Sequence, residues 1–136
     1  MKPAELFEEI VRVAPSFATV RRAHIEDYGE LLAHVLMGDL LRFVQSHFSG
    51  ELREGAAAPT QVEMQAIFDV LDQGLDAHET TENAIAVSFV EGIEEEEYFN
   101  DLERFFGPLM REELERQRSW RPPPWPEGGA GGGAAR

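Results

Sequence analysis

The chain has 136 residues, of which 26 are Asp or Glu and 12 are Lys or Arg, so its formal net charge at pH 7 is −14. That length fits one domain of ordinary size, and a composition of 43% apolar and 28% charged residues is typical of a globular protein. The absence of cysteine excludes a disulfide framework, a thiolate zinc site and a cysteine nucleophile.

The two ends of the chain differ in character. The first thirteen residues mix acidic with apolar side chains and do not resemble a signal peptide, and no stretch of about 18 apolar residues occurs anywhere, so we expect a cytoplasmic protein. Residues 121–136 contain four of the eight prolines and a run of glycines. They predict a disordered, Pro/Gly-rich tail behind a folded domain that spans residues 3–120.

Hydrophobic residues recur with a helical period along the folded part of the chain. Pro3 suits the first turn of a helix, and the strongest apolar stripe runs from Glu30 to His47. Thr60 and Glu63 have the spacing of a capping box at the start of another helix. We therefore expect a helix from each of these starting points.

The segment 83–93 is apolar around nearly its whole circumference, which fits either a central buried helix or a buried strand. Its neighbours all have a helical period and a lone strand would have no partner, so we predict a helix, followed by another over residues 94–106. The fold class is therefore predicted as all-α, one compact domain of about six helices in an orthogonal or superhelical bundle.

Acidic residues concentrate in the middle of the chain. Residues 54–103 contain fourteen acidic side chains and no Lys or Arg, and therefore account for the entire net charge. Such a surface repels nucleic acid and anionic membranes and attracts a basic protein, although it also serves solubility alone. The predicted partner-binding residues are Asp69, Asp72, Asp76, Glu79, Glu94, Glu95, Glu96, Glu97, Tyr98 and Asp101.

No pattern in the sequence identifies catalytic chemistry. Glu30 and His34 have the spacing of one helical turn, at which a carboxylate and an imidazole can share a metal ion, but the repeated Glu-x-x-His of a bundle di-iron site is absent. Ser88 lacks the Gly-x-Ser-x-Gly context of a nucleophile elbow, and its hydroxyl is expected to bond back to the carbonyl of Ala84. We expect no cofactor, no metal ion and no catalytic residue.

A polar cluster is expected inside the domain. If the segment 83–93 is buried all round, Glu91 lies inside or at the edge of the core, where an unpaired carboxylate is costly. We therefore predict that Arg42 pairs with Glu91 or Asp39 as an internal clamp.

Three short segments resemble a known family. His34–Asp39 (HVLMGD), Ala86–Glu91 (AVSFVE) and Phe106–Leu109 (FGPL) are similar to segments in a family of small, uncharacterised, all-helical bacterial proteins that is described as a domain of unknown function. The resemblance implies a helical fold and no particular activity or catalytic residue. Small acidic domains of this type are often immunity partners of toxins, which is an analogy of type.

The leading hypothesis is a non-enzymatic, acidic protein-binding domain, such as an immunity protein that neutralises a basic toxin by covering its cationic cleft. Two alternatives remain open. One is a small helical enzyme or metal binder that uses Glu30, His34 and Asp39. The other is a scaffold module that binds through the Pro-rich tail around Trp125. The sequence leaves the oligomeric state open.

Overall fold

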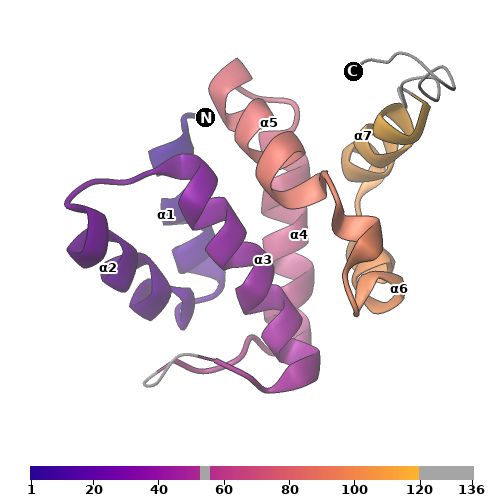
Figure 1. Cartoon of the computed structure of the whole chain (residues 1–136). Helices are drawn as coiled ribbons and strands as arrows, with labels where there is room; N and C mark the ends of the chain where they lie inside the picture. Colours follow the sequence, from indigo (N-terminus) through magenta and orange to yellow (C-terminus); the bar gives the residue numbers. More distant parts are fainter. Residues whose placement is uncertain (53–55, 120–136) are drawn as a thin grey trace, which may run out of the picture.

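Seven α-helices, joined by turns and short 3₁₀ and π segments, make up residues 1–52 and 56–119, the part of the chain that the computed structural model describes (Figure 1). The predicted tail, including Trp125, lies outside these residues. They contain no strand, which confirms the all-α class. The helices are α1 (Pro3–Val13), α2 (Phe17–Tyr28), α3 (Ala33–Ser49), α4 (Gln61–Gly74), α5 (Glu79–Ile85), α6 (Phe99–Leu102) and α7 (Pro108–Ser119).

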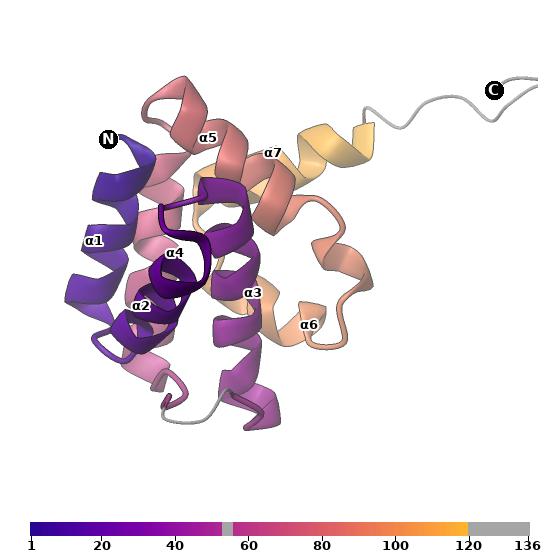
Figure 2. The ribbon, with the colours of Figure 1, turned by 60° about the vertical axis from the view of Figure 1, so that its left-hand side comes forward.

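Helix α4 lies at the centre of the domain. It packs against α1, α3, α5 and α7, while α3 also packs against α2 on one side and against the segment after α5 on the other. Figures 1 and 2 show α2 and α6 on opposite sides of α3, with α7 beyond α5. None of the described helices is long and apolar enough to span a membrane.

The ends of the helices largely follow the capping residues. Thr60 Oγ1 accepts a hydrogen bond from Glu63 N at 3.2 Å and Thr60 N donates to Glu63 Oε1 at 2.9 Å, which confirms the capping box. Gly29 has φ of +75° and ends α2 three residues before Leu32, the extended residue that precedes α3. Helix α3 therefore starts later than the predicted Glu30, and Glu30 is not on it.

The segment 83–93 is helical, as predicted, but its helix is irregular. Helix α5 continues into a π-helical turn over Ala86–Val90, where Glu91 N donates to Ala86 O at 2.9 Å, five residues back. The expectation of burial on all sides is wrong, because Val87 is 45% exposed and Glu91 is exposed. The helix has one face in solvent, and Glu91 follows its end in an exposed turn.

The predicted single helix over residues 94–106 is wrong. The chain forms a 3₁₀ turn at Ile93–Glu95, then α6, then a second 3₁₀ turn at Glu103–Phe105. The backbone is extended at Glu96, which ends the first turn, and at Phe106, which ends the second. At that second end the rings of Phe105 and Phe106 both stack on Phe68, with centroids 5.6 and 5.8 Å away. Consecutive residues of an α-helix point in directions about 100° apart, so a continuous helix would not bring both rings to one partner.

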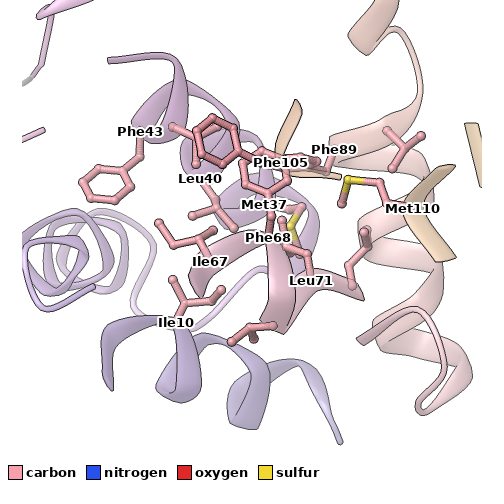
Figure 3. Close-up of a cluster of buried hydrophobic side chains, with 14 of the residues drawn as sticks. Ile10, Met37, Leu40, Phe43, Ile67, Phe68, Leu71, Phe89, Phe105 and Met110 are labelled. Carbon is pink, nitrogen blue, oxygen red and sulfur yellow. The ribbon is translucent and has the colours of Figure 1, made fainter. Parts of the chain in front are cut away.

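Phe68 is at the centre of the hydrophobic core (Figure 3). Its ring also meets Phe89 of the π turn edge-on, with centroids 5.7 Å apart. The surrounding side chains come from all parts of the chain and include Ile10, Met37, Leu40, Phe43, Ile67, Leu71 and Met110, each at most 1% exposed. The core thus joins the first helix to the last through α4.

Helix α7 is capped by a residue of another helix. Gly107, which precedes Pro108, has no side chain to accept the free N–H groups of the first turn, and Asp72 Oδ1 of α4 accepts from Met110 N at 2.8 Å instead. A Cβ at Gly107 would lie 2.5 Å from the Asp72 carboxyl carbon, so this approach requires glycine. Asp72 was predicted as a partner-binding residue, but its carboxylate caps α7 within the domain.

Replacing Asp72 with Ala should lower the free energy of unfolding by about 1 kcal/mol, the usual effect of losing a side chain that caps a helix. Asp69→Ala on the exposed face of α4 is the matched control, expected to stay within about 0.5 kcal/mol of the wild type. Both changes replace Asp with Ala within α4 and so give the same gain in helix propensity. The difference between their free energies of unfolding, measured in urea, therefore reports the contribution of the cap. Equal stabilities would contradict this role of Asp72.

Candidate functional site

Two adjoining hollows lie along α3 and form the candidate functional site. The first, here called the inner hollow, has a volume of about 420 Å³ and lies between α2, α3 and residues 51–52. The second, the outer hollow, has about 470 Å³ and lies between α3 and residues 96–98. Arg42 and Glu51 line both. We call the two hollows together the α3 groove.

The charged side chains of the α3 groove are predominantly acidic. Arg42 is the one cationic side chain that lines it among the described residues. Its guanidinium is paired with Asp39, three residues before it on α3. The carboxylates that line the groove are Asp27, Asp39, Glu51, Glu96 and Glu97. The groove therefore carries an excess of four negative charges over a short distance, which favours a cationic ligand.

His24 lines the inner hollow although only 2% of its surface is exposed. Its Nε2 accepts a hydrogen bond from the backbone N–H of Leu32 at 2.9 Å, so Nε2 is unprotonated and the neutral ring carries its proton on Nδ1. That buried Nδ1 has no hydrogen-bond partner in the structure. Asp39 Oδ2 lies 3.9 Å from it, too far for a hydrogen bond.

The local fold explains how His24 reaches Leu32. Gly29, in the left-handed conformation, reverses the chain after α2 and places the start of α3 beside the last turns of α2. The N–H of Leu32 is free because it precedes α3, and the imidazole satisfies it from eight residues away. The sequence gives no signal for this role of His24, because the contact depends on the left-handed turn at Gly29 and not on a regular spacing of residues.

The predicted internal clamp is wrong in its location. Arg42 does pair with Asp39, but its side chain is 70% exposed and that of Asp39 is 26% exposed, so the pair lies at the surface. Glu91 is exposed and has no ion pair with Arg42. An exposed pair of this kind contributes at most about 1 kcal/mol to stability.

Tyr98 reports on the electrostatics of the outer hollow. Its ring stacks on Phe48 with centroids 5.4 Å apart and is partly buried. Partial burial raises the pKa of Tyr98, and the negative charges of Glu97 and Glu51 raise it further, because each disfavours the phenolate. Burial is the largest cause of this shift, and the two carboxylates contribute the electrostatic part.

The structure disperses the other predicted partner-binding residues. Glu94 pairs with Arg118 of α7 at 2.9 Å, and Glu95 lines a hollow beside that same arginine. Asp76 lines another hollow together with Arg116. The basic side chains of α7 thus offset part of the acidic span, while Glu96, Glu97 and Tyr98 meet in the α3 groove.

Asp69, Glu79 and Asp101 belong to neither hollow of the groove. Asp69 accepts a hydrogen bond from Gln65 on α4 at 3.0 Å. Glu79 lies in the first turn of α5 and Asp101 lies on α6. Of the ten predicted residues, three line the α3 groove, namely Glu96, Glu97 and Tyr98.

His34 of α3 and Ser88 of the π turn form a hydrogen-bonded pair at the surface. His34 Nδ1 and Ser88 Oγ are 2.7 Å apart, which replaces the predicted bond from Ser88 to Ala84. Within residues 1–52 and 56–119 no carboxylate is hydrogen-bonded to the His34 ring, and no group of three His, Asp or Glu side chains is placed to hold a metal ion. Glu30 precedes α3, so the helical spacing that suggested a shared ion is lost.

The fold and the site define an acidic, all-α domain with a groove lined by carboxylates. The chain belongs to the family described as Domain of unknown function (DUF7674), whose model matches residues 7–121. This membership confirms the resemblance to a family of unknown function. Searches among curated proteins and among solved structures each found no match.

Removing the neighbouring carboxylates should lower the pKa of Tyr98. In a Tyr28→Phe background Tyr98 is the one remaining tyrosine, and its ionisation is followed by ultraviolet absorbance. Glu51→Gln and Glu97→Gln together should lower this pKa, yet leave it above the ordinary value, because burial is the largest cause of the shift. Glu79→Gln, an equal charge change elsewhere, should have little effect. An unchanged pKa in the double variant would contradict the negative potential.

Proposed function

We propose that this protein is a binding domain without catalytic chemistry that docks a basic partner protein in the α3 groove. The observation that carries the proposal is the lining of the groove, where the described residues contribute five carboxylates and one arginine. The size of each hollow falls within the range of about 300–1,000 Å³ typical of ligand sites, which suits one or two side chains of a partner.

The charge of the whole chain supports this choice of partner. A net charge of −14 repels the phosphates of nucleic acids and anionic lipids and attracts cationic proteins. Long-range attraction would raise the association rate in a salt-dependent way. Tyr28 and Tyr98 line the groove and provide the aromatic surface that often anchors an interface.

The positions of the arginines support one side of the domain as the side that a partner approaches. The acidic side chains near α7 have arginine neighbours, as Glu94 has Arg118, whereas the described residues that line the α3 groove include one arginine, Arg42. A partner would therefore approach α3 and residues 96–98 rather than α7. One role of this kind is that of an immunity protein, which would block a basic toxin by covering its cationic substrate cleft.

A charge-neutralised groove should associate more slowly with the partner. The variant is Asp27→Asn, Glu51→Gln and Glu97→Gln, three exposed positions of the groove. The partner would be captured from a cell extract at low salt, identified and purified. We expect a decrease in its association rate on the order of tenfold at low salt and a much smaller decrease at high salt.

The matched control removes the same charges elsewhere, through Glu8→Gln, Asp76→Asn and Glu95→Gln, which are also exposed. Asp76 and Glu95 belong to the surface that the sequence predicted, so the two variants compare that surface with the groove. An association rate reduced by the control and preserved in the groove variant would refute docking in the α3 groove.

A further inference from the structure

The inner hollow combines features that select one kind of side chain. We infer that it is a subsite for a single arginine of the basic partner, and that Arg42 occupies the Asp39 carboxylate of this subsite until the partner's arginine displaces it. This inference rests on the proposed function, since it names the group by which the partner would be recognised.

The first support is that a guanidinium, that of Arg42, already lies at the proposed subsite. Arg42 places its guanidinium against Asp39, which shows that this carboxylate is positioned to hold a guanidinium. The Arg42 side chain is 70% exposed, so few contacts fix it in place. Exposed ion pairs are weak and easily replaced, whereas an arginine brought in by a partner would bind in a site that the partner covers.

The second support is the unpartnered Nδ1 of His24. A buried N–H without an acceptor is unfavourable, and Asp39 Oδ2 lies 3.9 Å away from it. Arg42 reaches Asp39 through Oδ1. If Arg42 leaves and the carboxylate shifts inward, Oδ2 can accept from Nδ1 while its outer lone pairs hold the new guanidinium. Binding of the partner would thus satisfy a donor that the free protein leaves unsatisfied.

The third support is the match between the walls and an arginine side chain. Val20, Phe43 and Leu52 line the inner hollow and can cover the methylene groups of the stem. Tyr28 is 51% exposed, its ring lies 4.9 Å from that of His24, and an aromatic face of this kind stacks well on a flat guanidinium.

The same lining argues against an anionic ligand. Arg42 and the His24 N–H are donors, but three carboxylates, Asp27, Asp39 and Glu51, surround them. Lysine carries the required charge but lacks the planar fork that engages two carboxylate oxygens at once. The chemistry of the hollow therefore favours arginine over both alternatives.

Short peptides test the subsite without the partner. Acetyl-Gly-Arg-Gly-amide would be titrated into the full-length, ¹⁵N-labelled protein, alongside the same peptide with lysine or with citrulline, the neutral analogue of arginine. We expect saturable shifts of the Leu32 amide and of the Arg42 side-chain N–H signal with the arginine peptide, weaker binding with lysine and none with citrulline. Equal binding of citrulline, or no saturable shift with arginine, would overturn the inference.

Two substitutions separate displacement of Arg42 from a general charge effect. Arg42→Gln should strengthen binding of the arginine peptide by about three- to tenfold, because Arg42 no longer competes with the peptide for the Asp39 carboxylate. Asp39→Asn should weaken binding by at least about tenfold, since a charge-assisted pair is lost. Arg104→Gln, an equal charge change at an exposed position outside the groove, is the control. A gain with Arg104→Gln as large as that with Arg42→Gln would refute displacement.

The outcomes also separate this inference from the proposed function. If the arginine peptide does not bind but the charge-neutralised groove still loses its partner, the groove docks a partner through other contacts and the arginine subsite is wrong. If the peptide binds as expected while partner association is unaffected by the groove variant, the subsite is supported and docking of that partner in the groove is wrong.

Discussion

The ring of Phe68 is the contact on which much of the domain depends. It receives Phe89 from the π turn and both Phe105 and Phe106 from the segment before α7. The chain before Phe105 turns at Ile93–Glu95, and Glu96 and Glu97 lie across from α3 in the outer hollow. One turn of α4 further on, Asp72 caps α7. Phe68 and Asp72 thus tie the segment before α7 and the start of α7 to α4.

Acidic and basic residues concentrate in different segments of the chain, and in the fold they meet near α7, whereas the α3 groove has an excess of carboxylates. Residues 54–103 contain no Lys or Arg, so their carboxylates find cationic partners only in other segments. Arg118 of α7 pairs with Glu94, and Arg116 lies beside Asp76. Among the described residues that line the α3 groove there is one arginine, Arg42, and it is paired with Asp39. The excess negative charge consequently remains in the groove, where a partner can use it.

The inner hollow brings together two unusual features of the same helix pair. His24 uses one ring nitrogen to satisfy the start of α3 and leaves the other buried without an acceptor. Asp39 lies near that nitrogen but is drawn toward Arg42. Structures generally satisfy their buried polar groups, so an exception at the edge of a cavity is a natural place for a ligand to complete the network.

The sequence by itself determined the helical class, the capping box at Thr60 and the concentration of acidic residues in the middle of the chain, because periodicity, local capping and composition are properties of neighbouring residues. It also predicted Glu96, Glu97 and Tyr98 as binding residues, and the structure places these three in the outer hollow of the α3 groove. Only the tertiary structure decided that Asp72 caps α7 and that His24 faces Asp39. Those contacts join residues that are far apart along the chain or separated by a left-handed turn. Which carboxylates remain unpaired depends on how the helices cross, and no local pattern encodes that.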